Sequence, residues 1–412
     1  MSETEDSTRL PDAQQGGSEN KQSRNERIEH FLRERYTFRF NTIKCKPEFC
    51  KVGKSLFVPV AKYDFNSLKR EIDGAIGLNT SAENIRSILE SDFSPKVNPV
   101  QEYFRELSHA YSDMTGYIRL LAKTVHVANS GKWEEYLTKW LVGVVANAMN
   151  DTGCQNHTCL VLTGGQGKFK TSWLDNLCPR SLQSYLYTGK IDPQNKDVQT
   201  LIAEYLLINI DDQLKALNKR DENELKNMIT APAVKYRRPY DVYIEEYPHL
   251  ASFMASVNGN DFLTDSTGSR RFLPFEIVSI NIEAAQTLDM DNVWSEATCL
   301  YQQGYRYWFN DTEIEELHGL NRSFQVQTIE YEMLMRGFEK PSEIDADRFM
   351  QTSQILSYLQ GYTSVKLSER RMGEAIREVG FERTQKRIGD RSTPSYGWKI
   401  KKVLPVPFSD DY

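Results

Sequence analysis

The feature that most constrains this 412-residue chain is an apolar strand, a glycine-rich turn and a helix that follow one another directly. The run CLVL at 159–162 is typical of a buried strand, and residues 170–177 carry apolar side chains at helical spacing. From 158 to about 280, short β-branched strands alternate with helices, and parallel strands require such crossovers. The sequence therefore predicts an α/β fold with a parallel sheet.

The turn resembles a Walker A phosphate-binding loop. Gly164, Lys170 and Thr171 match the G-x-x-x-x-G-K-[ST] spacing, but Phe169 replaces the second glycine. In such a loop, backbone amides surround phosphate, the lysine reaches the β- and γ-phosphates, and the hydroxyl holds Mg²⁺. Phe169 fits if its backbone torsions are ordinary and its ring points away. The predicted nucleotide-binding residues are Gly164, Gly165, Gln166, Gly167, Lys168, Phe169, Lys170, Thr171 and Ser172. The alternative is a glycine-rich turn with an incidental lysine.

Polar residues end the next two predicted strands. YLLINIDD ends in Asp211 and Asp212, about 40 residues after Thr171, and HLASFMASVN ends in Asn258. Acidic residues at strand ends are often only solvated, but this spacing favours a metal site. We expect Thr171 and Asp211 to hold Mg²⁺, and Asp212 to orient or deprotonate the attacking water. Asn258 would then lie beside the nucleotide. Lys170, Asp211, Asp212 and Asn258 are thus candidate catalytic residues.

Two adjacent arginines, Arg270 and Arg271, stand on a turn before a further strand. Such pairs are usually surface charge. Here they are also candidates for an arginine finger, which stabilises transition-state charge and often comes from a neighbouring subunit.

Composition divides the chain into five expected segments. They are a disordered tail (1–25), a small α+β region (26–112), a helical collar (113–157), a P-loop core with a helical extension (158–340) and a winged-helix-like module (341–412). No apolar run reaches the roughly 18 residues of a membrane helix, and the amino-terminal segment has no secretory apolar core. We therefore expect a cytoplasmic protein with no membrane partner.

The net charge of −6 argues against a wholly basic nucleic-acid-binding surface, so basic patches must be local. Residues 366–402 hold eleven Lys and Arg against five Asp and Glu. This asymmetry predicts DNA-backbone binding, with protein contacts as the alternative. The predicted contacts are Arg370, Arg371 and Arg377 on a helix, and Lys386 and Arg387 on a wing.

A second basic stretch, VKYRRPYDVYIEEYPH, interleaves Lys235, Arg237 and Arg238 with tyrosines. Cationic groups suit phosphates and aromatic faces suit bases, so these three residues could bind DNA. Equally, the stretch could be a surface hairpin whose arginines pair with Glu245 and Glu246, or one that contacts nucleotide in a neighbouring subunit.

An ordered series of motifs resembles the virulence-associated protein E family over about 98–275. The series is NPVQEYF, KWLVGVVANAM, LTGGQGKFKTSWL, IDPQNKD, INIDDQL, RRPY and SVNGNDFLTDSTGSRRFLPF. Members of this family are P-loop ATPases akin to superfamily 3 helicases, found in phages and integrative elements. The resemblance implies roles for Lys170, Thr171, Asp211, Asp212, Asn258, and Arg270 or Arg271.

The resemblance also implies a function. It is that of an ATP- and Mg²⁺-dependent, helicase-like ATP hydrolase in replication of a phage or mobile element. Single-stranded and origin DNA, a separate primase or initiator, and further copies in a ring such as a hexamer would be its partners. Phe169 keeps a second class open, a DNA-binding switch that binds ATP but hardly hydrolyses it. A third alternative is an ATPase that interferes with competing phages.

Overall fold

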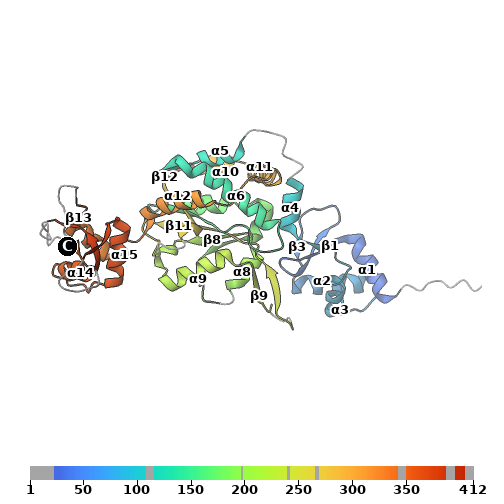
Figure 1. The fold of residues 1–412 in the computed structure, drawn as a ribbon. Helices are drawn as coiled ribbons and strands as arrows, with labels where there is room; N and C mark the ends of the chain where they lie inside the picture. The colour runs from blue at the N-terminus through green and yellow to red at the C-terminus, as the bar shows by residue number, and fades with distance from the viewer. Residues whose placement is uncertain are drawn as a thin grey trace, which may run out of the picture. The chain divides into compact units, whose positions relative to one another are not determined.

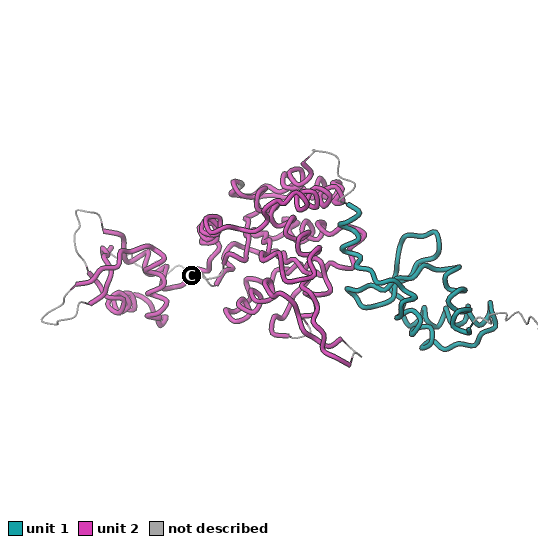
Figure 2. The backbone as a smooth tube through the Cα atoms, turned by 45° about the vertical axis from the view of Figure 1, so that its right-hand side comes forward, with its two compact units in different colours: residues 1–113 teal, residues 114–412 magenta. Residues whose placement is uncertain are grey.

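The computed structural model describes residues 23–107, 116–195, 198–238, 242–264, 269–341, 349–386 and 395–403. The chain is a mixed α/β protein whose largest described sheet is mainly parallel, as expected in general form. It separates into two compact units, residues 1–113 and residues 114–412, coloured separately in Figure 2. Each unit is described by itself.

The first unit combines a small sheet with four helices. Its strands are β1 (Tyr36–Asn41), β2 (Lys46–Lys51), β3 (Val58–Pro59) and β4 (Lys96–Val97), in the order β3-β2-β1-β4. Its helices are α1 (Arg24–Arg35), α2 (Lys62–Ile76), α3 (Ala82–Leu89) and α4 (Pro99–Leu107). Apolar side chains of α1, α2 and α3 share one buried core with β1, including Leu32, Ile72 and Ile85.

Helix α1 corrects the predicted extent of the amino-terminal tail. The hydroxyl of Ser23 accepts from the Glu26 amide at 3.2 Å, and the Glu26 carboxylate accepts from the Ser23 amide at 2.8 Å. This capping box lets a helix begin at Arg24, and burial of Ile28 and Leu32 stabilises it. The tail predicted for 1–25 thus overlaps the helix, and residues 1–22 lie outside the described ranges.

The second unit is built on a six-stranded sheet with the order β5-β12-β6-β11-β8-β7 (Figure 1). The strands are β5 (Val125–Val127), β6 (Cys159–Gly164), β7 (Leu186–Gly189), β8 (Leu207–Asp211), β11 (Ser252–Asn258) and β12 (Phe272–Ile280). All except β5 are parallel. Every residue of β6 is buried, as expected for a central parallel strand covered on both faces.

Eight α-helices accompany this sheet among the described residues. They are α5 (Tyr117–Lys123), α6 (Trp133–Ala148), α7 (Lys170–Asn176), α8 (Gln199–Glu204), α9 (Lys219–Thr230), α10 (Ile282–Thr287), α11 (Met290–Gln302) and α12 (Asp311–Asn321). Helix α6 is buried along most of its length. Trp140 Nε1 donates to the Phe253 carbonyl at 3.2 Å, and Asn147 Nδ2 donates to the Leu250 carbonyl at 3.0 Å. These bonds fix α6 against β11 and the segment before it.

The carboxyl-terminal part of this unit has its own apolar core. Its elements are α13 (Ile329–Gly337), β13 (Phe338–Glu339), β14 (Phe349–Met350), α14 (Thr352–Gln360), α15 (Glu369–Val379), β15 (Arg383–Lys386), β16 (Ser395–Lys399) and β17 (Lys401–Lys402). Strands β14, β16 and β15 form an antiparallel sheet. Within the described ranges, none of the helices carries the long apolar stretch that crossing a bilayer requires.

Candidate active site

Three strand ends bring the predicted site residues together. Strand β11 lies between β6 and β8, with Asn258 opposite Gly164 and Ser256 opposite Asp211. Because these strands are parallel, their carboxyl ends meet at one edge of the sheet. The loop after Gly164 leads directly into α7, whose first residues are Lys170 and Thr171. The expected convergence of these elements is therefore present.

Lys170 lies at the centre of this edge. Its Nζ atom donates to the carbonyls of Gly164 at 3.2 Å and Gly165 at 2.7 Å, and to Asn258 Oδ1 at 3.1 Å. Burial lowers the pKa of Lys170, while the nearby carboxylate of Asp212 acts in the opposite direction. The amine is thus held by three oxygens between the loop, β6 and β11.

Two hydroxyl groups surround the carboxylate of Asp211. Thr171 Oγ1 and Ser256 Oγ each donate to Asp211 Oδ1 at 2.7 Å. Hydroxyl and carboxylate oxygens are ligands that Mg²⁺ prefers, and this ion usually takes its remaining ligands from water and phosphate. Among the described residues, no group of three His, Cys, Asp or Glu is placed to hold a metal. Thr171 and Asp211 fit a magnesium ion of that kind.

Asp212 faces Asn258 rather than Thr171. Its two carboxylate oxygens accept from the Asn258 backbone amide at 3.1 Å and from Asn258 Nδ2 at 2.8 Å. Its backbone has φ 46°, in the left-handed region that aspartate tolerates better than most residues. This turn of the chain explains why adjacent aspartates have separate partners.

Phe169 departs from the expected backbone geometry. Its φ of 59° and ψ of 21° are left-handed, so the expectation of ordinary torsions is wrong. For a residue with a Cβ this conformation costs about 1–2 kcal/mol. The glycine expected here would adopt it freely. The aromatic ring is 55% exposed, so burial of the side chain gives little compensation.

The remaining loop residues have distinct positions. Gly164 has φ 129°, and a Cβ there would lie 3.0 Å from the Ile277 carbonyl oxygen, so a close approach of β12 requires this glycine. Lys168 Nζ donates to the same carbonyl at 2.8 Å, which ties the loop to β12. The other predicted members, Gly165, Gln166, Gly167 and Ser172, are exposed.

Sequence reasoning missed two polar residues of the site. Ser256 binds Asp211, and Asn209 Nδ2 donates to Asp175 Oδ1 at 2.8 Å and to the Thr171 carbonyl at 3.5 Å. Each is a polar residue in an apolar strand, two positions before a residue already selected. Alternate residues of a strand share one face, so this spacing is the signal that could have identified them.

Arg270 and Arg271 lie at the opposite edge of the sheet. They belong to the short helix η5 (Ser269–Arg271), directly before Phe272, which pairs with the first residue of β6. Gly164 is the last residue of β6, five steps or about 17 Å further on. Within one chain, the structure does not bring these arginines to Lys170.

The hairpin of β9 (Ala233–Tyr236) and β10 (Glu245–Pro248) holds part of the basic stretch with Lys235, Arg237 and Arg238. Lys235, rather than an arginine, pairs with Glu246 at 3.1 Å, and Arg237 is exposed. Arg238 departs from the DNA-contact expectation because it is only 8% exposed. Its guanidinium lies 4.6 Å from the centre of the Tyr247 ring.

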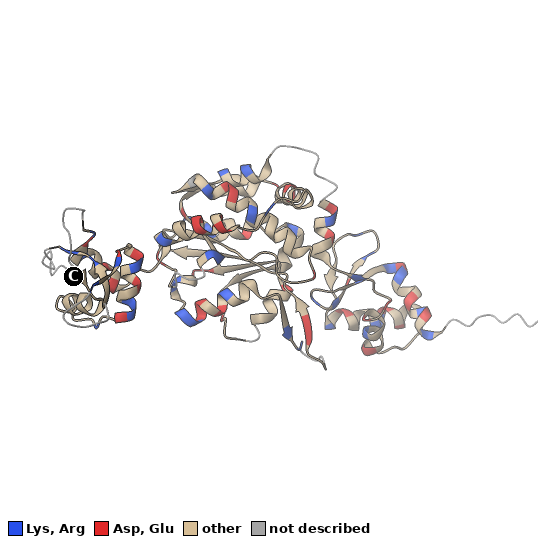
Figure 3. Cartoon of the chain, viewed as in Figure 1, with Lys and Arg blue, Asp and Glu red and all other residues tan. Residues whose placement is uncertain are grey.

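The basic residues of α15 and β15 are on the surface. Arg370 pairs with Glu374 on the same helix at 3.1 Å. Arg371, Arg377 and Lys386 are exposed, and Figure 3 shows blue and red ribbon segments interspersed over this part of the chain. Arg387, the second predicted wing residue, lies outside the described residues.

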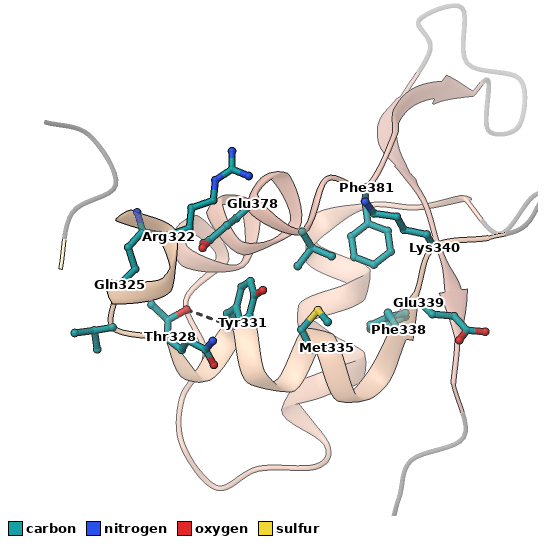
Figure 4. Close-up of a pocket in the computed structure, with 13 residues that line it drawn as sticks. Arg322, Gln325, Thr328, Tyr331, Met335, Phe338, Glu339, Lys340, Glu378 and Phe381 are labelled. Atoms are coloured by element: carbon teal, nitrogen blue, oxygen red, sulfur yellow. Dashed lines mark hydrogen bonds between the residues drawn. The ribbon is translucent and has the colours of Figure 1, made fainter. Parts of the chain in front are cut away.

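A cavity of about 510 Å³ lies beside α13 and the end of α15 (Figure 4). Tyr331, Met335 and Phe381 contribute apolar side chains, and Arg322 and Glu378 lie at one end. Burial raises the pKa of Glu378, with Arg322 opposing it. None of the predicted site residues lines this cavity.

Comparison with known proteins identifies the family. The model of the virulence-associated protein E-like domain matches residues 108–326. This chain belongs to the virulence-associated protein E-like family, which confirms the resemblance inferred from its motifs.

Two solved structures align with most of this chain at low sequence identity. The apo structure of the NrS-1 C-terminal region (305–718) has a TM-score of 0.48 and 10% identity, covering 91% of this chain and 98% of that chain. An A-form apo structure of the NrS-1 C-terminal region has a TM-score of 0.47 and 13% identity, with 91% and 99% coverage. No curated protein matches the chain.

Proposed function

We propose that this chain is an ATP hydrolase with a P-loop core. One observation carries the proposal: Lys170 Nζ, Thr171 Oγ1 and the Asp211 carboxylate lie at the same sheet edge, linked through hydrogen bonds to the loop, Ser256 and Asn258. An ammonium, a hydroxyl and a carboxylate next to a glycine-rich loop are the groups that a magnesium-bound triphosphate needs.

In this proposal each residue has a separate task. Lys170 and the amides of the loop bind the phosphates of ATP. Thr171 and Asp211 hold Mg²⁺, which neutralises phosphate charge when bound. Asp212 orients the attacking water and accepts its proton. The two hydrogen bonds from Asn258 fix the Asp212 carboxylate, so this base is positioned before ATP arrives.

The arginine finger acts between copies of the chain. Arg270 and Arg271 are about 17 Å from Gly164 by strand register, so their own nucleotide is beyond their reach. A head-to-tail contact would place the turn of one copy against the nucleotide of the next. This supports an assembly in which turnover needs at least two copies, as in a closed ring.

The function we propose is movement on, or opening of, DNA during replication of a phage or mobile element. Membership of the family and the exposed arginines of α15 support it. We infer that α14, α15 and the paired strands β15 and β16 act as a winged-helix-like module, in which Arg371 and Arg377 would face DNA. A separate primase or initiator would complete the replication machinery.

Phosphate release from Mg-ATP, with and without single-stranded DNA, tests the proposal. Wild type should turn over ATP and be stimulated by DNA. Lys170→Ala should abolish turnover, while Lys123→Ala, which removes an exposed lysine at the end of α5, should leave it unchanged. Equal turnover in wild type and Lys170→Ala would disprove the assignment.

One observation favours a second candidate, a nucleotide-dependent DNA-binding switch. The loop holds Phe169 in a left-handed conformation that is strained for a residue with a Cβ, and a strained loop could bind ATP without efficient hydrolysis. The switch predicts DNA affinity that changes with Mg-ATP while phosphate release stays at background. DNA-stimulated release would exclude it.

A further inference from the structure

A cavity of about 240 Å³ lies beside η5, at the sheet edge opposite Lys170. It is lined by the residues before β6, the η5 turn and the loop between α11 and α12, together with Thr230 at the end of α9 and Ile314 of α12. The side chains that matter here are His157, Arg270, Arg271, Tyr307, Trp308 and Phe309. The cavity therefore combines two guanidinium groups with an aromatic wall.

The two arginines have no anion of their own among the described residues. No carboxylate lines the cavity, and the buried Nε atom of Arg271 has no hydrogen-bond partner there. Burial lowers the pKa of Arg271, and the adjacent charge of Arg270 adds to the effect. Arg271 is half-buried beside the exposed Arg270, and this neighbouring charge is unfavourable for it, so an anion from outside the chain would stabilise the pair.

The η5 turn is fixed rather than adaptable. Asn321 of α12 donates through Nδ2 to the Ser269 carbonyl at 2.7 Å and to the Phe272 carbonyl at 3.1 Å. These bonds hold both ends of the turn that carries Arg270 and Arg271. Because the turn is already held in place, less conformational entropy is lost when an anion binds to its arginines.

Trp308 is the most exposed tryptophan of the chain. It is 57% exposed, whereas the other five tryptophans are at most 7% exposed. Its neighbour Tyr307 meets it edge-on, with ring centres 5.2 Å apart, and donates through its hydroxyl to Gln155 Oε1 at 3.0 Å. An exposed indole beside two arginines is the chemistry that contacts a nucleotide, through its base or ribose and its phosphates.

The size of the cavity limits what enters it. At about 240 Å³ it is smaller than the roughly 300–1,000 Å³ of complete small-molecule sites. It therefore fits one edge of a nucleotide that is held mainly elsewhere. The Lys170 site of the same chain is at the far end of the sheet, so the nucleotide must be held by another molecule.

We propose that Trp308 contacts the nucleotide bound at Lys170 of a neighbouring copy, beside Arg270 and Arg271. This inference rests on the proposed ATPase function and adds a residue to its composite site. A strand of DNA would bring the same phosphate and base chemistry to the cavity, and the experiment separates the two sources.

Mixed variants test whether the nucleotide comes from the neighbour. Lys170→Ala chains keep Trp308 but cannot hold ATP, and Trp308→Phe chains hold ATP but lack the reporter. Mg-ATP should change the tryptophan emission of the mixture and reduce iodide quenching of Trp308. A mixture of Trp308→Phe chains with Lys170→Ala/Trp308→Phe chains measures the background from Trp173, which lies in α7 near Lys170.

The outcomes are distinct. A Mg-ATP response in the Trp308-containing mixture alone supports the proposal. A response of Lys170→Ala chains by themselves would mean that free nucleotide fills the cavity, and a response only to a deoxythymidine oligonucleotide would mean that DNA does. Either result overturns the proposal, as does no response while wild type hydrolyses ATP. If wild type neither binds nor hydrolyses ATP, the proposed function itself has failed.

Steady-state kinetics give a second readout. Trp308→Ala should raise the ATP concentration for half-maximal turnover about tenfold, because aromatic stacking on a nucleotide is lost. The maximal rate should change much less, since this contact exists in both ground and transition states. Trp308→Phe should restore most of the affinity. Unchanged half-saturation in Trp308→Ala would contradict the assignment.

Discussion

Asn258 Oδ1 accepts a hydrogen bond from Lys170 Nζ at 3.1 Å, across 88 residues of sequence. The amide group of the same residue donates to Asp212 at 2.8 Å, which fixes its orientation. One side chain at the end of β11 therefore joins the proposed phosphate-binding lysine to the proposed base. A displacement of the Lys170 amine or of the Asp212 carboxylate would therefore be transmitted to the other group through Asn258.

Asn258→Ala should uncouple these two groups. We expect turnover to fall on the order of 10²-fold, because the Asp212 carboxylate and the Lys170 amine lose a shared partner that holds them in place. Nucleotide affinity should fall less, since the loop amides remain. Phosphate release and nucleotide titration measure the two effects. Asn176→Ala removes an amide that bonds the Ala285 carbonyl, and it serves as the control. Equal rates in both variants would contradict this role.

Phe169→Gly should stabilise the fold. The left-handed backbone at this position costs about 1 kcal/mol for a residue with a Cβ, and the exposed ring contributes little packing. We expect the free energy of unfolding in urea to rise by about 0.5–1 kcal/mol. Phe169→Ala keeps the Cβ while removing the ring, so it should not stabilise. Equal stability of the glycine and alanine variants would show that backbone strain is not the cause.

The edge of the sheet could be predicted because each strand is a local run of apolar residues, and strands that alternate with helices must pair in parallel. Apolar strands ending in Gly164, Asp211 and Asn258 place those ends together once the strands are parallel. Membership of the family followed from the order of the motifs. The same reasoning extends to Ser256, a polar residue two positions before Asn258 and therefore on the same face of β11.

Other features depend on tertiary contacts that sequence patterns do not contain. The left-handed torsions of Phe169 and Asp212 arise from the path of the loops after two strands. The inward turn of Arg238 depends on Tyr247, nine residues away across a hairpin. The separation of Arg271 from Lys170 follows from strand register. Arg271 directly precedes β12, whose first residue pairs with the first residue of β6, whereas Gly164 is the last residue of β6. None of these three features can be predicted from how close the residues lie to one another in the sequence.

Glu313→Gln should lower the free energy of unfolding and make that free energy less dependent on pH in the acidic range. Burial disfavours the Glu313 carboxylate, but bonds from the Asn310 amide, Lys139 and Arg306 outweigh it and lower its pKa to about 2. Because the folded pKa is below the ordinary 4.5, the stabilisation is complete above pH 4.5 and is lost as pH falls towards 2. We expect a loss of about 3 kcal/mol at pH 7, since Lys139 is left buried without its partner.

Urea unfolding at pH 7 and pH 3 measures this effect. The difference in unfolding free energy between wild type and Glu313→Gln should be smaller at pH 3. Glu315→Gln, which changes an exposed carboxylate on the same helix, should cost less than about 0.5 kcal/mol at either pH. A pH-independent difference for Glu313→Gln would show that packing, not charge, explains the loss.

Arg371→Ala and Arg377→Ala should each weaken DNA binding with little dependence on base sequence. Both guanidinium groups are exposed on α15, where they can reach phosphates. Neutralising one phosphate releases about one counterion, so each variant should reduce the slope of log affinity against log salt by about 1. Fluorescence anisotropy with a labelled duplex at several salt concentrations measures the slope. Arg70→Ala removes an exposed arginine of α2 and should leave it unchanged. If all three variants lose affinity equally, the basic end of the chain acts only through net charge, and α15 is not the DNA-binding element.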